Sequence, residues 1–355
     1  MINKLNILNT VNQLNGDCGG AGYSPMSRAY FDAMTVQLPS ATKKVIDAAI
    51  VATEDVIAKM DCMMLALATE QQSLLWLNDP TKTGVKVNSP TFTAYKGWSG
   101  DSTNNVNTGY NPGDGGSHNL TRNNTTISFY SNKYIDLANS LWAGNNGTAM
   151  SGLSIGVYGD EQRVLGGIND DGSYFVNTGV YIKEFLVNRR DGSSSSYRNF
   201  NLYKISRSVE SAAVLNSDVK IALTENRGAL FFAGSFLDDD ELSSFMSAWL
   251  PVLEHLGSDY WSNFTPTTLT ATAGAGKIDL AWTLPVTTYS PYTVTNVVIQ
   301  ESEDNVTFTD IATLGAVEAY EATVPTGQTR YYKIRYISSR NIHTTNSAEA
   351  HATAL

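Results

Sequence analysis

The first apolar pattern along the chain is helical. Between residues 38 and 60, apolar side chains recur three and four residues apart and share one helix face, at Ala41, Val45, Ala48, Ala52 and Val56. Pro39 stands near the start of this stretch, where proline suits a first helical turn. A second helix is predicted from Met63 to Leu77, and Pro80 ends it because its ring disfavours helix in the preceding residue. We expect the apolar face of each helix to pack against the rest of the protein.

From residue 81 to residue 237 the pattern changes to short strands divided by clusters of glycine, asparagine and aspartate. The clusters lie at residues 99–101, 111–116, 169–172 and 191–192. Strands with such spacing and boundaries predict a sandwich or a barrel. Asp171-Gly172 and Asp191-Gly192 are expected to be hairpin turns, because these residue types tolerate positive φ.

A third helix is predicted from Asp238 to Leu256. Its first turn is acidic, which favours the positive end of the helix dipole, and Gly257 is the expected C-cap. Pro251 predicts a kink. The apolar face consists of Leu242, Phe245, Trp249, Val252 and Leu256. Residues 258–266 are then a short linker, and residues 267–355 are all-β, about the length of one immunoglobulin-like sandwich.

The N-terminal segment, residues 1–35, is predicted to attach the protein to a partner. Its first part is rich in asparagine and glycine, and glycine loses much conformational freedom on ordering. Because termini are poorly ordered unless they are tied down, we expect a neighbouring chain to hold this segment. Residues 36–80 are then a helical segment packed on a sandwich formed by residues 81–257.

Composition narrows the functional classes. The chain has 355 residues, which favours two domains, and 42% of them are hydrophobic, enough for sizeable cores. The net charge of −10, with no basic cluster longer than Arg189-Arg190, argues against nucleic acid as a partner. Cys18 and Cys62 are too few for a disulfide scaffold.

Targeting signals are not recognisable. No stretch reaches the ~18 apolar residues of a membrane span, and residues 1–15 lack the basic start and apolar centre of a signal peptide. We therefore expect no membrane insertion, and a protein that folds in a cytosol and is kept there or released by lysis.

The C-terminal segment resembles a fibronectin type III domain. Ile278 to Trp282 alternates apolar and polar residues, with Trp282 where that family buries a core tryptophan. Residues 298–312 are similar to the central hairpin of the family, and Tyr331 to Tyr336 to its sixth strand. Arg330 falls where the family usually has a corner tyrosine. The resemblance implies an immunoglobulin-like sandwich and says little about function.

The middle segment resembles the laminin-G/concanavalin-like jelly rolls of tailed-phage and prophage virion proteins. The resemblance rests on residues 87–101 with 107–112, on 187–199 as a late hairpin, and on 229–234 as a closing strand followed by a helix. The fold implied for the whole chain is mainly β: an N-terminal helical segment, a jelly-roll sandwich with a closing helix, and a fibronectin type III-like sandwich.

Candidate chemistry is sparse. Jelly-roll enzymes that cleave polysaccharides place paired carboxylates on one strand as Glu-x-Asp-x-Glu, and no such run is present. The nearest, Glu301 to Asp304, is expected to be a solvated turn. The histidines have no metal-ligand spacing and are expected at surfaces or helix ends: His118, His255, His343 and His351. Calcium bound by Asp114, Asp170 and Asp171 is an alternative to ordinary hairpin turns.

Sugar binding is the sharper alternative for the jelly roll. Tyr110, Trp98, Tyr174 and Tyr197 lie among polar loop residues, although packing is the favoured role for Trp98 and Tyr110. We therefore predict no catalytic, cofactor-binding or metal-binding residues, no cofactor, and no enzymatic activity.

The functional hypothesis is a structural protein of a phage virion, a fibre or decoration subunit of head or tail. Its N-terminal segment would contact capsid or tail proteins, and its sandwiches would face outward and adhere to surface glycans. Such subunits form closed oligomers, which predicts a homotrimer or dimer. The alternatives are a glycan-degrading depolymerase and a bacterial carbohydrate-binding adhesin.

Overall fold

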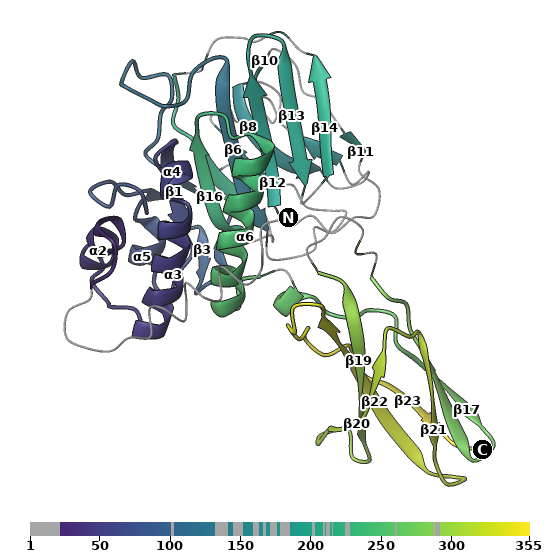
Figure 1. Cartoon of the computed structure of the whole chain (residues 1–355). Helices are drawn as coiled ribbons and strands as arrows, with labels where there is room; N and C mark the ends of the chain where they lie inside the picture. Colours follow the sequence, from purple (N-terminus) through teal and green to yellow (C-terminus); the bar gives the residue numbers. More distant parts are fainter. Residues whose placement is uncertain are drawn as a thin grey trace. The chain divides into compact units, whose positions relative to one another are not determined.

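The computed structural model shows a mainly β protein that divides into two compact units (Figure 1). In the described part of the chain, unit 1 runs from residue 22 to Ser258 and unit 2 from Asp259 to Leu355. The described residues are 22–100, 103–131, 141–144, 152–158, 163–165, 168–170, 176–177, 185–200, 203–208, 210, 214, 216–223, 228–259, 261–285, 287 and 292–355.

Unit 1 opens with short helices. They are α2 (Pro25–Asp32), α3 (Ser40–Ala52), α4 (Glu54–Ile57) and α5 (Glu70–Leu74). Ser24 caps α2, and its backbone N–H also donates to Asp47 of α3 at 2.8 Å, which joins the two helices. The predicted face of α3 is only partly right: Val45 and Ala48 are half-buried, whereas Ala41 and Ala52 are exposed. The buried positions are Thr42, Ile46, Asp47, Ala49 and Ile50.

The second predicted helix, Met63 to Leu77, is confirmed only over the short helix α5, because the start of this segment belongs to a strand. Met60–Leu65 is strand β1, which pairs antiparallel with the predicted closing strand, β16 (Gly228–Gly234). The run is buried on both faces, so its apolar residues are nearly continuous, and a short apolar run does not distinguish a buried strand from a helix. A Cβ on Gly234 would lie 2.3 Å from the Lys59 carbonyl oxygen, so glycine permits this pairing.

The first sheet of unit 1 has eight strands in the order β14-β13-β12-β6-β16-β4-β3, with β1 also paired to β16. The remaining strands are β3 (Thr91–Thr93), β4 (Gly97–Ser99), β6 (Asn124–Ser131), β12 (Phe185–Asp191), β13 (Ser195–Phe200) and β14 (Tyr203–Ser208). The predicted hairpin at Asp191-Gly192 is confirmed: it joins β12 to β13, and Gly192 has φ of +78°.

The second sheet packs face to face with the first and has the order β11-β9-β8-β7-β15-β5-β2, with β10 paired to β8. Its strands are β2 (Val85–Val87), β5 (Asn105–Asn107), β7 (Leu141–Gly144), β8 (Gly152–Tyr158), β9 (Arg163–Leu165), β10 (Ile168–Asp170), β11 (Val176–Asn177) and β15 (Lys220–Leu223). The predicted turn at Asp171-Gly172 lies outside the described residues.

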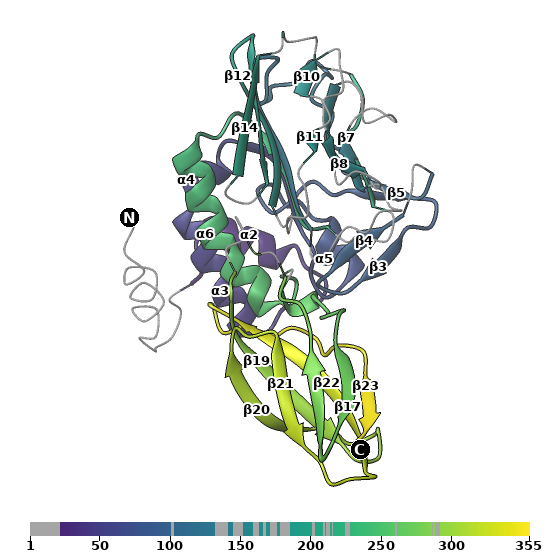
Figure 2. The same ribbon diagram turned by 90° about the vertical axis from the view of Figure 1, so that its right-hand side faces the viewer.

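Helix α6 (Asp239–His255) confirms the third predicted helix and lies beside α3 on the first sheet (Figure 2). Phe245 packs on Phe232 of β16, with ring centroids 4.7 Å apart. Trp249 is fully buried, and its indole N–H donates to Thr53 at 3.2 Å. Gly257 follows with φ of +63°, as expected of a C-cap. No helix in the described ranges has the length and apolar character needed to cross a bilayer.

Unit 2 is a sandwich of a three-stranded sheet, β17-β18-β21, and a four-stranded sheet, β20-β19-β22-β23. The strands are β17 (Thr270–Gly274), β18 (Lys277–Ala281), β19 (Val294–Ser302), β20 (Thr309–Gly315), β21 (Ala319–Thr323), β22 (Thr329–Ser338) and β23 (Ala350–Thr353). This division of seven strands is the immunoglobulin-like arrangement implied by the sequence, with Tyr331 to Tyr336 on the sixth strand.

The core of unit 2 includes residues N-terminal to its first strand. Trp261, in a 3-10 turn (Trp261–Asn263), is fully buried and stacks between Phe264 and Tyr292, with both centroid distances 5.7 Å. Trp282 is also buried, and its indole N–H donates to the Val317 carbonyl oxygen at 2.7 Å. Both tryptophans are therefore part of the core of unit 2.

The edge strand β20 is irregular. Its pairing with β19 shifts register, because Ile299 faces Ala312 whereas the next residue, Gln300, faces Asp310. Ile311 is therefore an extra residue, which makes a β-bulge on the outer strand of the four-stranded sheet.

Candidate functional site

The aromatic residues considered for sugar stacking are packing residues where they are described. Trp98 and Tyr110 are 4% and 1% exposed. The Trp98 ring packs on Phe92 with a centroid distance of 4.8 Å, and the Tyr110 ring meets Trp76 edge-on at 6.2 Å. Tyr174 and the side chain of Tyr197 lie outside the described residues.

Tyr110 belongs to a chain of polar groups that fixes the long turn after β5. Its hydroxyl donates to Asp61 at 2.9 Å, and the carboxylate of Asp61 also accepts the backbone N–H groups of Asn119 and Leu120. His118 lies edge-on to the Tyr110 ring at 5.5 Å and contacts Asp114 at 2.7 Å. Burial, reinforced by the Asp61 charge, raises the pKa of Tyr110, so it stays a proton donor.

The alternative calcium ligand Asp114 is engaged within this turn. Its Oδ1 contacts His118 and accepts the Gly116 N–H at 2.7 Å, and these hydrogen bonds lower its pKa. Asp171 and the side chain of Asp170 are outside the described ranges. Within the described ranges, no three histidine, cysteine, aspartate or glutamate side chains lie close enough together to hold a metal ion.

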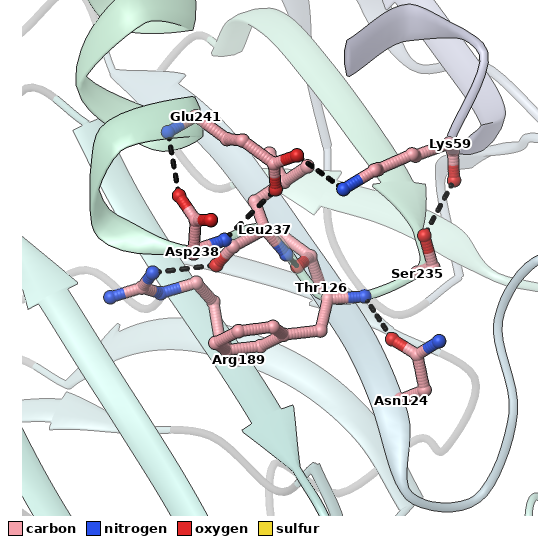
Figure 3. Close-up of polar contacts among 9 residues, drawn as sticks. Lys59, Asn124, Thr126, Arg189, Ser235, Leu237, Asp238 and Glu241 are labelled. Atoms are coloured by element: carbon pink, nitrogen blue, oxygen red, sulfur yellow. Dashed lines mark hydrogen bonds and ion pairs between the residues drawn. The ribbon is translucent and has the colours of Figure 1, made fainter. Parts of the chain in front are cut away.

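The most elaborate polar network in the described part of unit 1 joins β16 to α6 (Figure 3). Asp238 and Glu241 form a capping box, in which each side chain accepts the backbone N–H of the other residue. The other Glu241 oxygen pairs with Lys59, next to β1. The connecting backbone is fixed to β6, because the Phe236 N–H donates to Asn124 at 2.5 Å and the Leu237 N–H to Thr126 at 3.0 Å.

Arg189 of β12 completes this network from beneath the helix. Its side chain is fully buried, donates to the Leu237 carbonyl oxygen at 2.6 Å and pairs with Asp239 at 2.6 Å. Lys204 of β14 reaches the other Asp239 oxygen at 2.7 Å. These two cations lower the pKa of Asp239 through hydrogen bonds, that from Lys204 first. The network attaches a helix to a sheet, and we assign it a structural role.

The sequence contained a signal for this network. Arg189 occupies an interior position of a strand, and the acidic start of α6 follows later in the chain. A buried arginine needs an anionic or carbonyl partner. The sequence alone marks Arg189 only as a basic residue, because the distance in sequence to Asp239 hides their contact.

Unit 2 presents a different kind of surface, which we call the outer face. It is the side of the four-stranded sheet turned away from the sandwich core, opposite Tyr332, Ile334 and Tyr336. It includes Gln300, Phe308, Asp310, Tyr331, Lys333, Arg335 and His351.

The middle of the outer face is a fixed ion pair. Both terminal nitrogens of Arg335 bind Asp310, at 3.0 and 2.6 Å, and the Gln300 amide donates to the same carboxylate at 2.8 Å. The hydrogen bond from Arg335 and then that from Gln300 lower the pKa of Asp310. His343 lies 3.4 Å from the Arg335 Nε. The two-point contact holds the guanidinium plane in one orientation.

One part of the outer face has a charge and a hydrogen-bond acceptor that no other described residue uses. It is formed by Lys333, Phe308 and Gln300. The Lys333 ammonium lies 4.0 Å from the centre of the Phe308 ring. Directly across the strand pair, Gln300 is 9% exposed, and its Oε1 has no hydrogen-bond partner among the described residues. Two residues before Lys333 on β22, the Tyr331 ring packs against the His351 ring, with ring centroids 5.3 Å apart.

The carboxylates of the acidic run Glu301 to Asp304 do not converge on one site. Glu301 accepts from the Tyr332 hydroxyl at 2.9 Å, and Glu303 pairs with Arg330, the residue at the expected corner-tyrosine position. Asp304 accepts the backbone N–H groups of Thr307 and Val306, which lower its pKa to about 2. Glu301 and Glu303 both contact Arg330, whose Nε lies 3.7 Å from Glu301, whereas Asp304 is used within the turn.

The other two histidines are paired locally. His255, in the last turn of α6, contacts Thr42 of α3 at 3.1 Å, and His351 pairs with Glu349 at 2.7 Å. Cys62 is a free thiol buried in β1, where burial raises its pKa, and Cys18 lies outside the described residues.

Comparisons with known proteins bear on the fold only. No protein-family model and no curated protein matches the sequence. Similar solved structures include the binding domain of botulinum neurotoxin DC in complex with rat synaptotagmin II, at 12% identity and a TM-score of 0.45, covering 79% of this chain and 74% of that chain.

Two further neighbours match more weakly. The sixth fibronectin type III domain of human fibronectin type III domain containing protein 3 is 14% identical, with a TM-score of 0.23, covering 26% of this chain and 84% of the domain. A β-1,2-glucanase from Parabacteroides distasonis is 11% identical with a TM-score of 0.23, and the match covers 72% of this chain but only 31% of the glucanase. At these TM-scores the likenesses carry no functional argument.

Proposed function

We propose that this protein is a non-catalytic structural subunit of a phage virion, a fibre or decoration protein of head or tail that presents its β-sandwich units outward. The observation that carries the proposal is the outer face of unit 2, where ordered aromatic and charged side chains lie on a rigid sheet. Rigid scaffolds with preformed surface groups suit binding, because little ordering cost remains to be met on contact.

The polar networks of unit 1 support the same proposal. The Arg189 network and the Asp61 network hold a helix and a long turn against the sandwich. In the proposed arrangement unit 1 is a structural platform. The N-terminal segment, residues 1–35, contacts capsid or tail proteins, and closed association into a trimer or dimer presents several copies of unit 2.

Two measurements test this proposal. Mass spectrometry of purified particles is expected to detect the protein, and light scattering of the purified protein is expected to give a dimer or trimer. A monomer that is absent from particles would overturn the proposal. Release of reducing sugars from a polysaccharide by the purified protein would instead establish the depolymerase alternative.

A further inference from the structure

We infer that the outer face of unit 2 binds a carboxylate-bearing saccharide, with Lys333 as the group that recognises the acid. The inference rests on the proposed outward-facing role and adds to it a site and a ligand class. Three side chains carry it: Lys333, Phe308 and Gln300.

The pairing of charged groups in unit 2 sets Lys333 apart. The protein has a net charge of −10, and in the described part of unit 2 its other lysine and two of its arginines are neutralised locally. Lys277 pairs with Glu321, Arg330 with Glu303 and Arg335 with Asp310. The Lys333 ammonium pairs with no carboxylate among the described residues and rests on an aromatic ring. A carboxylate from outside the chain therefore meets a cation whose charge is not yet neutralised.

A buried hydrogen-bond acceptor lies beside Lys333. Gln300 is nine-tenths buried, its Nε2 is engaged by Asp310, and its Oε1 has no partner in the described structure. A buried polar atom without a partner is costly. Because this oxygen is itself shielded from solvent, the Lys333 side chain must move aside before a ligand hydroxyl can donate to it. Cross-strand pairing places this acceptor next to Lys333.

The Phe308 ring provides an aromatic surface beneath the Lys333 ammonium. When the Lys333 ammonium moves from the Phe308 ring onto a ligand carboxylate, it uncovers a ring face on which a sugar ring can pack. An exposed cation–π contact is weak, so a charge-assisted hydrogen bond can replace it. Carboxylate, hydroxyl and apolar sugar face together match Lys333, Gln300 and Phe308. An acidic peptide supplies the carboxylate but not the adjacent ring of hydroxyl donors.

The test uses the full-length protein and a tetramer of galacturonic acid, with the methyl-esterified tetramer as the uncharged control. NMR titration of the isotopically labelled protein is expected to shift backbone signals of β19, β20 and β22. The ester is expected to bind about tenfold more weakly, and Lys333→Gln to lower affinity for the acid by a similar factor. Gln300→Met is expected to weaken both ligands.

Matched variants separate recognition from folding. Lys333→Arg keeps the charge and is expected to retain binding, whereas Lys277→Gln removes a lysine from the other sheet and is expected to leave binding unchanged. Equal binding of acid and ester, equal binding by Lys333→Gln, equal binding of an oligoglutamate peptide, or no binding of the acid would each overturn the inference. Detection of the protein in particles is an independent result, so the proposed function stands or falls separately.

Discussion

At the scale of single residues, Arg189 is the side chain on which the attachment of α6 depends most. Removing it by Arg189→Ala leaves the buried Leu237 carbonyl oxygen without its donor and opens a cavity against Phe236. We expect the free energy of unfolding to fall by about 3 kcal/mol. Urea denaturation of the full-length protein measures this.

The matched control is Lys204→Ala, which removes the other cation from Asp239. Lys204 is one-third exposed, so its loss is expected to cost less than about 1 kcal/mol. Equal losses of stability in the two variants would show that burial of Arg189 does not increase its contribution to stability.

Asp304 provides a pH prediction at the same scale. Its pKa falls from 3.8 to about 2 on folding, because backbone N–H groups stabilise its charge. A depressed folded-state pKa stabilises the protein above about pH 4, and this contribution is lost as the pH falls toward 2. Asp304→Asn is therefore expected to flatten the decline in unfolding midpoint across this window.

The direct measurement is a carboxyl NMR titration of Asp304 in the full-length protein. A midpoint near 3.8 would contradict the hydrogen-bonding pattern of the turn. The Asp310 signal serves as an internal comparison, since its pKa is also lowered, but by Arg335 and Gln300.

At the scale of elements, the cap of α6 makes a separable contribution. Asp238→Ala removes the acceptor for the Glu241 N–H, and loss of such a cap costs about 1 kcal/mol. Glu241→Gln keeps an oxygen for the Asp238 N–H but removes the charge that Lys59 contacts, which is expected to cost less than about 0.5 kcal/mol. Thermal unfolding of the two variants should rank them in that order, and the reverse order would contradict the capping role.

Elements differed in how far the sequence predicted them. Helix α6 carried independent local signals at both ends, an acidic first turn and Gly257, and its bounds came within one residue. Strand β1 carried only an apolar run, and its identity depends on pairing with β16, far along the chain. The face of α3 was predicted only in part because alanine suits either side of a helix, whereas burial is decided by the neighbouring α6.

At the scale of the whole molecule, the start of unit 2 is testable by truncation. Residues 258–266 were expected to be a linker, yet Trp261 in this segment is fully buried between aromatic rings. We expect residues 259–355 to fold alone, and a fragment of residues 267–355 to be less stable by about 3 kcal/mol, the usual cost of deleting a buried tryptophan. Thermal denaturation of both fragments provides the measurement, and equal midpoints would contradict a structural role for Trp261.

The mainly β architecture followed from the sequence because strand length, turn residues and alternation are local properties. The candidate binding surface did not. Phe308 directly precedes β20 and meets Lys333 of β22 only because both strands pair with β19. Gln300 of β19 has an unpaired oxygen although Asp310 engages its nitrogen. Such relations are set by tertiary pairing, which spacing along the chain does not reveal.

The bulge at Ile311 affects how readily copies of the protein aggregate when they lie close together. A strand that buckles outward cannot template a continuation of its own ladder, so another polypeptide laid along β20 would lose the regular sequence of donors and acceptors. Where many copies lie close together, the bulge therefore disfavours edge-to-edge pairing of β20 strands into fibrils. The outer face of the four-stranded sheet then stays free for binding.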